Sequence, residues 1–292
     1  MHTRLFKKGI TFILSFTLFV TPIMAKAPEI TAEGAILIEP KTNTILYTKN
    51  ANQKLYPASM TKIMTALIIA EEMPCQSIIT KSQDSITYVP SDSSSIGLQV
   101  GDSYTMLNGL HGLLLGSDNY IAHDLALAHS GSIAKFAQEM NTRAKSYGAL
   151  HTHFTNPHGY HDPQHYTTPY DMAQIARVAF SNPLVLKIAG KVSAPFGCHN
   201  THTILPLTNT SRLLKDETPY YNPHVVACKT GFHDDAQQTL VAKAVYDDLE
   251  LIAVVMKTST PNQYVDINRL FEYGAKNFSI QKSAHTYELV KN

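Results

Sequence analysis

The chain has 292 residues, 44% of them apolar and 16% charged, a composition typical of one large globular domain or two small ones. Its 24 basic and 23 acidic residues nearly balance. The chain therefore lacks the excess of positive charge that would indicate a nucleic-acid partner. Three cysteines are too few for a disulfide framework and show no metal-binding spacing. Their odd number leaves at least one thiol without a partner in the chain.

The first 25 residues have the pattern of a secretory signal peptide. Three basic residues precede an apolar stretch at residues 10–20, and the small residue Ala25 marks the expected cleavage point. A retained anchor is the alternative, although the apolar stretch is shorter than the ~20 residues that span a bilayer. Cleavage removes three basic and no acidic residues, which leaves a net charge of 21 − 23 = −2. We therefore expect an exported protein.

The N-terminal part predicts a hairpin followed by a buried helix. Residues 34–39 and 44–47 are β-rich runs that flank a turn-rich link, which predicts an antiparallel pair. The almost unbroken apolar run at residues 63–70 is typical of a helix buried on most sides. The polar residues 82–95, rich in serine and aspartate, predict a loop.

Helices are predicted through the middle of the chain and strands return near its end. The expected helices are residues 107–115, 121–128, 133–147, 172–180 and 264–278. The expected strands are residues 225–231, 240–245 and 251–256, the last two joined by a turn. These elements predict one α/β domain, whose antiparallel sheet joins N- and C-terminal strands and packs against a mainly helical middle region.

We expect this domain to span residues 26–278, followed by a C-terminal tail at residues 279–292. The tail is too short for a second β domain or an amphipathic anchor helix. No stable membrane anchor is therefore expected after signal cleavage.

Five histidines fall within residues 151–165 and raise the question of a metal site. A zinc site is one interpretation. The segment is interrupted by proline and glycine, however, and no pair of these histidines has a helical ligand spacing with a following acid. A loop with structural histidines is the favoured interpretation, and no metal is assigned.

Ser59 and Lys62 open the expected buried helix and lie one turn apart, on the same face. A serine hydroxyl attacks a carbonyl only when a neighbouring base takes its proton, and lysine is such a base only when neutral. Burial or a nearby cation favours that neutral form. The spacing alone is weak, because a serine and a lysine three residues apart are common on helices.

Two later motifs offer further groups that acyl transfer from an amide needs. Ser117 has a hydroxyl that can pass a proton to the leaving nitrogen, and Asn119 has a carboxamide that can bind a substrate amide. Lys229 brings a cation that favours neutral Lys62 and attracts a carboxylate.

The residues that follow Lys229 on its expected strand complete the candidate site. Thr230 offers a hydroxyl to the same carboxylate, and Gly231 lets a substrate approach the strand backbone closely. The expected oxyanion donors are the backbone N–H groups of Ser59 and Phe232. Strand alternation places Cys228 on the opposite face, which predicts a packed thiol rather than a reactive one.

Ser-x-x-Lys, Ser-Asp-Asn and Lys-Thr-Gly, in this order, resemble the motifs of penicillin-binding proteins and class A β-lactamases. They begin at Ser59, Ser117 and Lys229. From about residue 34 to about residue 278, the chain is similar to the secreted D-alanyl-D-alanine carboxypeptidases among the low-molecular-mass penicillin-binding proteins. The loop at residues 153–159 is especially close to that family.

The resemblance implies a β-lactamase/transpeptidase-like fold, with a mixed sheet covered by helices. It implies acylation of the serine by a peptidoglycan stem peptide ending in D-Ala-D-Ala, release of D-alanine, and hydrolysis. Covalent inhibition by β-lactams and action in the periplasm or another extracytoplasmic cell-wall space are also implied. No cofactor is expected.

The sequence departs from the family pattern beside two motifs. Asp118 stands where glycine is more frequent, Tyr120 where an aspartate usually follows, and Gln237 where a glycine is expected. These departures bear on substrate preference and rate rather than on the three catalytic elements.

Alternative functions remain open at this point. A D,D-endopeptidase that cuts cross-links is poorly separated from a carboxypeptidase, because both cleave after D-alanine. A β-lactamase is less favoured, since no Glu-x-x-Leu-Asn stretch is present to activate a deacylating water. A non-catalytic protein that binds cell-wall peptide is a further alternative. Which arginine contacts the substrate carboxylate is open, and Arg212 is only a weak candidate.

Overall fold

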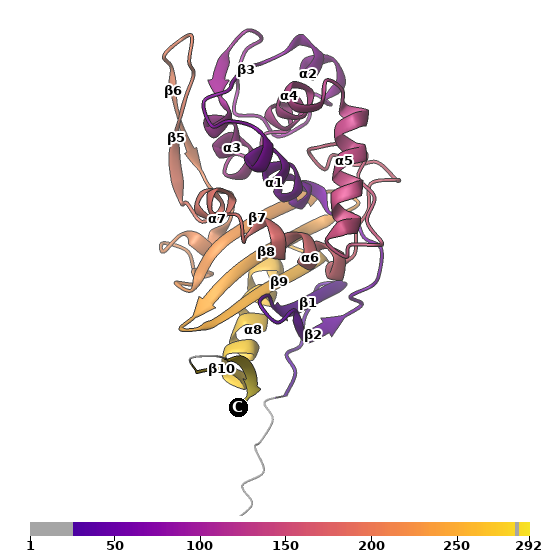
Figure 1. Cartoon of the computed structure of the whole chain (residues 1–292), viewed down its shortest axis with the longest axis vertical. Coiled ribbons are helices and arrows are strands. Elements are labelled where there is room, and N and C mark those ends of the chain that lie inside the picture. The colour runs from indigo at the N-terminus through magenta and orange to yellow at the C-terminus, as the bar shows by residue number, and fades with distance from the viewer. Residues whose placement is uncertain (1–25, 284–285) are drawn as a thin grey trace, which may run out of the picture.

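Five antiparallel strands form the central sheet, in the order β2-β1-β9-β8-β7 (Figure 1). The computed structural model describes residues 26–283 and 286–292, so the expected signal peptide at residues 1–25 lies outside the described residues. The strands are β1 (Gly34–Glu39), β2 (Thr44–Lys49), β7 (Val225–His233), β8 (Gln237–Tyr246) and β9 (Leu249–Thr258). The predicted antiparallel sheet of N- and C-terminal strands is confirmed.

Helices cover both faces of this sheet. On one face lies the helical region, and on the other lies α8 (Asn262–Asn277), which packs on β8 and β9. The main helices of the region are α1 (Lys62–Glu72), α3 (Met106–Leu114), α4 (Asn119–Ser130), α5 (Ile133–Ser146) and α6 (Pro169–Ala179). Each overlaps a helix that the sequence predicts.

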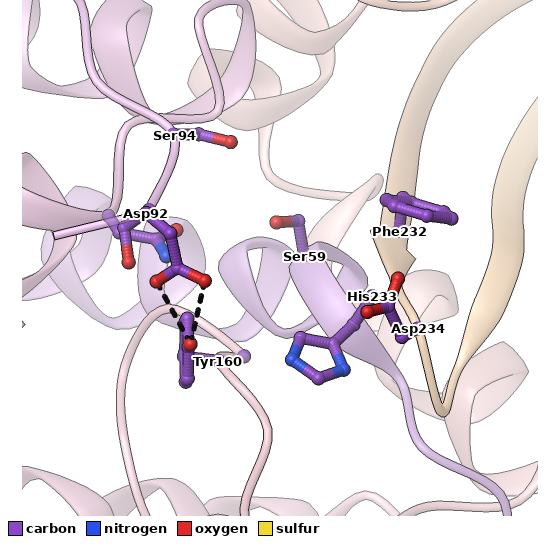
Figure 2. A pocket seen from close by; sticks show the side chains of 10 residues that line it. Ser59, Asp92, Ser94, Tyr160, Phe232, His233 and Asp234 are labelled. Atoms are coloured by element: carbon purple, nitrogen blue, oxygen red, sulfur yellow. Dashed lines mark hydrogen bonds between the residues drawn. The ribbon is translucent and has the colours of Figure 1, made fainter. Parts of the chain in front are cut away.

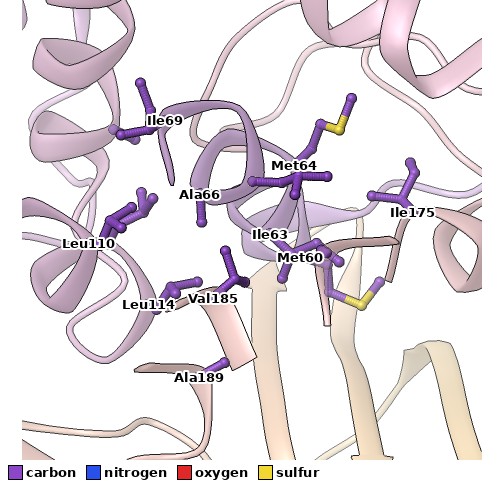
Figure 3. Close-up of a cluster of buried hydrophobic side chains, with 14 of the residues drawn as sticks. Met60, Ile63, Met64, Ala66, Ile69, Leu110, Leu114, Ile175, Val185 and Ala189 are labelled. Carbon is purple, nitrogen blue, oxygen red and sulfur yellow. The ribbon is translucent and has the colours of Figure 1, made fainter. Parts of the chain in front are cut away.

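Two hydrophobic cores follow from the alternation of side chains along the strands. In β1, Ile36 and Ile38 join the core under the helical region, whereas Ala35 and Leu37 join the core under α8. Figure 3 shows the first core around α1, where apolar side chains of α1 meet those of its neighbouring helices. The apolar run at residues 63–70 is therefore buried on most sides, and α1 is held rigidly at the centre of the molecule.

Several short elements were not predicted from the sequence. These are the helices α2 (Gln83–Tyr88) and α7 (Pro183–Ala189) and the strand pairs β3 (Ile78–Thr80) with β4 (Ser103–Thr105) and β5 (Ser193–Gly197) with β6 (Ile204–Thr208). The expected loop at residues 82–95 is therefore wrong where α2 lies. Ser82 caps α2 by accepting from the backbone N–H of Ser85, but its polar sequence has no apolar period that would indicate a helix.

Asn182 and Pro183 lie just after α6, and they also begin α7. Asn182 accepts hydrogen bonds from the backbone N–H groups of Leu184 and Val185, and Pro183 takes the first turn of α7, where a missing N–H costs nothing.

The C-terminal residues form a hairpin. β10 (Phe278–Lys282) pairs with β11 (Tyr287–Lys291), and the hydroxyl of Tyr287 donates to Glu39 of β1 at 3.1 Å. Among the described residues, no helix is long and apolar enough to cross a membrane.

Gln237 has a left-handed backbone with a φ of 52° at the start of β8. This conformation favours glycine, so the glutamine that stands at this place in the sequence carries backbone strain.

Candidate active site

The Ser59 turn lies where the helical region meets β7. Ser59 is in the short 3-10 helix Ala58–Thr61, which runs directly into α1 and packs on β7. Ala58, immediately before it, has a φ of 48°, a strained conformation for a residue with a side chain. Nζ of Lys62 is 2.8 Å from Oγ of Ser59, so the one-turn spacing brings the two groups into hydrogen-bond contact.

Lys62 is fully buried and has two further partners. Its Nζ donates to Oδ1 of Asn119 at 2.6 Å and to the backbone carbonyl of His158 at 2.8 Å. Both partners are carbonyl oxygens, which can only accept. A neutral amine has two N–H groups and one lone pair, so these acceptors occupy both N–H groups. The lone pair is then left for the hydroxyl proton of Ser59.

The surroundings of Lys62 favour this neutral form. Burial lowers its pKa well below the usual range, and the positive charge of Lys229 lowers it further. The carboxylate of Asp118 acts in the opposite direction but more weakly.

Lys229 and Ser117 form a second amine–hydroxyl pair. Nζ of Lys229 donates to Oγ of Ser117 and to the carbonyl of Thr230, both at 2.9 Å. Burial lowers the pKa of Lys229 to about 7. Ser117 has a φ of 57° and is the residue before the N-cap of α4, so the turn into this helix aims its side chain at β7.

Asp118 faces away from the reacting groups and holds the turn between Ser117 and Asn119. Its Oδ1 accepts from the backbone N–H of Ile121 at 2.8 Å, which caps α4, and its Oδ2 accepts from that of Ile96 at 2.7 Å. The aspartate in the middle motif therefore positions its neighbours, and it does not line the site.

Gly231 brings β7 against the serine turn. A Cβ atom at this residue would lie 2.4 Å from Oγ1 of Thr239 and 2.9 Å from the backbone nitrogen of Ser59, so only glycine fits without displacement. Thr230 and Phe232 flank it, and Oγ1 of Thr230 is 2.6 Å from that of Thr210. The structure thus brings the other seven residues of the sequence-predicted site together around Ser59.

Two adjoining hollows surround Ser59, and both include Ser94 and Phe232. The first, drawn in Figure 2, is lined by Ser59, Asp92, Ser93, Ser94, Asn119, Gly159, Tyr160, Phe232, His233 and Asp234. The second is lined by Ser59, Ser94, Ser117, Thr210, Thr230, Gly231, Phe232, Gln238 and Tyr264. Together they form a polar cleft with the serine hydroxyl between them.

Sequence reasoning missed the residues that narrow the first hollow. The hydroxyl of Tyr160 donates to both carboxylate oxygens of Asp92, at 2.9 and 3.1 Å, and joins two loops on one side of this hollow (Figure 2). It also missed the carbonyl of His158 as a partner of Lys62. The Tyr160–Asp92 contact and the carbonyl of His158 lie outside the three motifs. Both take their positions only when the loop at residues 153–165 folds back onto the serine turn.

Gly159 allows this loop to pack so closely. It has a φ of 82°, and a Cβ atom there would be 1.9 Å from the carbonyl oxygen of Ala58.

Arg212, the weak candidate for binding the carboxylate, lines neither hollow. Its guanidinium lies 6.0 Å from the ring of Tyr264, which does line the second.

All three cysteines are free thiols, and none of them lines the cleft. Cys228 is fully buried in the core under α8, as strand alternation predicts, and burial raises its pKa to about 11. It is therefore an unreactive packing residue.

A half-buried serine in contact with a fully buried lysine, beside a second lysine on the edge strand β7, is the arrangement typical of serine acyl-transfer enzymes of the penicillin-binding class. Comparisons with known proteins agree: residues 21–260 match the D-alanyl-D-alanine carboxypeptidase family, and the chain belongs to it.

Among curated relatives, the D-alanyl-D-alanine carboxypeptidase DacF of Bacillus subtilis is 36% identical over 80% of this chain and 59% of its own length. DacA of Haemophilus influenzae is 30% identical over 88% of this chain and 65% of its own length. The chain thus spans less than two thirds of these two relatives. A solved Streptomyces DD-transpeptidase is similar with a TM-score of 0.79 and 27% identity, over 85% of this chain and 98% of that one.

Proposed function

We propose that this chain is a serine-type D-alanyl-D-alanine carboxypeptidase, which removes the terminal D-alanine from peptidoglycan stem peptides. The observation that carries the proposal is the contact between Ser59 and a buried Lys62, whose two N–H groups are committed to carbonyl oxygens. This geometry directs the amine lone pair at the serine hydroxyl and supplies the base that the nucleophile needs.

Acylation follows from the positions of the groups. Oγ of Ser59 attacks the carbonyl carbon of the penultimate D-alanine while its proton passes to Nζ of Lys62. The backbone N–H groups of Ser59 and Phe232 donate to the oxygen that becomes negative. The peptide C–N bond then breaks, and Ser117 passes its proton to the nitrogen of the departing D-alanine while it takes a proton from Nζ of Lys229. Water then attacks the ester carbonyl and gives up a proton that returns to Lys229 through Ser117, while Lys62 returns its proton to Oγ of Ser59.

The substrate is held by groups on either side of the serine. The carboxylate of the terminal D-alanine is attracted to Lys229 and accepts from the hydroxyl of Thr230 in the second hollow. The carboxamide nitrogen of Asn119 donates to the stem peptide in the first hollow. The peptide backbone lies along Gly231.

Release of D-alanine tests this proposal. The purified protein is incubated with a stem pentapeptide ending in D-Ala-D-Ala, and free D-alanine is measured with a coupled oxidase. We expect release at a rate proportional to enzyme concentration. If circular dichroism shows that the protein is folded and the peptide nevertheless stays intact, the proposal is wrong. A cross-linked dimer as substrate distinguishes the D,D-endopeptidase, and multiple turnovers of nitrocefin would indicate a β-lactamase.

Lys229→Ala is expected to slow acylation of Ser59 by a β-lactam by about a hundredfold, comparable to the loss of one oxyanion donor. The variant loses the charge that favours neutral Lys62 and the cation that attracts the carboxylate. In the unmutated protein the rate is also expected to fall above about pH 7, where Lys229 loses its proton. Stopped-flow acylation measures both effects. Lys257→Ala, which removes a partly exposed lysine paired with Glu33, is the control. An unchanged rate in Lys229→Ala would contradict this role.

We also propose that the protein acts outside the cytoplasm, in the periplasm or the cell-wall space, where its substrate lies. The signal-like pattern of residues 1–25 and membership of a family of cell-wall enzymes support this location. β-Lactams are the expected covalent inhibitors.

A further inference from the structure

Three side chains that commonly bind metals converge beside the first hollow. His161 comes from the loop at residues 153–165, His233 ends β7, and Asp235 follows in the turn before β8. Oδ2 of Asp235 is 3.6 Å from Nδ1 of His161 and 3.7 Å from Nδ1 of His233. We propose that these three residues bind a divalent transition-metal ion, with Zn²⁺ as the first candidate.

The spacing of the three ligand atoms fits this ion. Tetrahedral zinc with bonds of about 2.0–2.1 Å to nitrogen or oxygen places its ligand atoms about 3.3 Å apart. The three atoms all lie within 4.8 Å of one another, so a small contraction closes the site. Two imidazoles and one carboxylate leave the fourth position to water, as in zinc sites with three protein ligands.

The rings of His161 and His233 are direct neighbours, with centroids 5.0 Å apart and planes 15° from parallel. Nδ1 of His161 is buried and has no hydrogen-bond partner, which is costly for a polar atom. Nδ1 of His233 accepts only a long bond of 3.4 Å from the backbone N–H of Asp235. A metal ion would satisfy both nitrogens.

Neighbouring aromatic rings fix the orientation of the two histidines. Tyr56 meets the ring of His161 edge-on, with centroids 4.7 Å apart, and Tyr160 meets that of His233 in the same way at 5.3 Å. Rings held in this manner lose little rotational freedom on binding an ion.

A second group of potential ligands in the described residues is less suited to a metal. Glu72, His129 and Glu139 lie close together, but Arg143 forms ion pairs with both carboxylates. These negative charges are already neutralised, whereas among the described residues no lysine or arginine forms an ion pair with Asp235, whose nearest such neighbours are the two histidines.

The sequence alone offered ligands for zinc only among the histidines of the loop itself. Of the five histidines, His161 alone belongs to the site, and the other two ligands come from the end of β7 and its turn. His165 instead bonds Oγ1 of Thr61, and His153 bonds the carbonyl of Gln164.

An ion at this place would join the two walls of the cleft. Tyr160 and His233 both line the first hollow, and His233 directly follows Phe232, whose N–H is the proposed oxyanion donor. Metal binding would therefore clamp the loop to the end of β7 and fix the width of the cleft beside Ser59. The proposal concerns binding, so it does not rest on the proposed function.

The test uses chelator-treated protein, titrated with Zn²⁺ by calorimetry and with Co²⁺ by visible absorption. We expect one ion per chain, a Co²⁺ spectrum typical of tetrahedral coordination, and a melting temperature about 5 °C higher at Zn²⁺ a hundredfold above its Kd. Hydrogen exchange should slow in the peptides that contain residues 160–162 and 232–235. His161→Gln and His233→Gln should each weaken binding by about tenfold or more.

His202→Gln, an exposed histidine in the β5–β6 turn, is the matched control and should bind as the unmutated protein does. Absence of Zn²⁺ binding, or binding that is unchanged in both histidine variants, would overturn the proposal. Loss of binding in Glu72→Gln instead would place the ion at the other group and would also overturn it. Zinc binding by a protein that releases no D-alanine would contradict the proposed function and support this site.

Discussion

Ser59→Ala is expected to abolish covalent labelling by a fluorescent penicillin. The variant has no hydroxyl at this position, and Lys62 has its two N–H groups bonded to the carbonyl oxygens of His158 and Asn119. We expect the acylation rate to fall by at least about four orders of magnitude, as for other enzymes that lose their serine nucleophile. Gel fluorescence after denaturation, followed by mass spectrometry of the labelled peptide, measures the loss.

Ser94→Ala is the matched control, because Ser94 lines both hollows next to Ser59. It should keep its labelling within a few-fold. Labelling of Ser59→Ala at the unmutated rate would show that another residue is the nucleophile. No labelling of the unmutated protein would instead favour a non-catalytic protein that binds cell-wall peptide.

Lys62→Met is expected to slow acylation by about 10²–10⁴-fold, the usual contribution of a positioned general base. Methionine has a similar length and is apolar, so it suits the fully buried position of Lys62, although two carbonyl oxygens lose their donor. Thermal unfolding should therefore be recorded beside the stopped-flow rate, to separate loss of base from loss of fold.

The pH dependence of the acylation rate is a second, independent test of Lys62 as the base. Lys62 acts as a base only when neutral, and its pKa is lowered by burial and by the charge of Lys229. The acylation rate of the unmutated protein is therefore expected to fall as the pH drops below this lowered pKa. Lys62→Met should lose this acidic limb, because no lysine remains to be protonated. An acidic limb that persists in the variant would show that another group is the base.

Much of the fold could be predicted because its main elements have clear periods. The apolar run after Lys62 and the strands around Lys229 are long and regular, and the structure confirms them. The missed elements lack this regularity. α2 buries Ser85 alone, and the β5–β6 hairpin carries proline in both strands, a residue that argues against strand assignment.

Short polar elements of this kind are stabilised by contacts from elsewhere in the chain. Ser82, the cap of α2, donates to the carboxylate of Asp124 in α4, and Asn108 of α3 donates to the carbonyl of Gly197 in β5. Contacts between segments so distant in the chain have no local sequence pattern.

The sequence by itself determined which chemical groups are present and which of them share a face. Ser59 and Lys62 must meet because they are one turn apart, and Cys228 must point away from Lys229 because strands alternate. Such relations are local, so the backbone period fixes them before the chain folds.

Only the tertiary structure decided the protonation of those groups and the shape of the cleft. Burial and the charge of Lys229 lower the pKa of Lys62, and its Nζ donates to the carbonyl of His158. His161 meets His233 only because the histidine-rich loop folds back onto the end of β7. Desolvation and charge act through space rather than along the chain, so these properties exist only once distant segments are packed together.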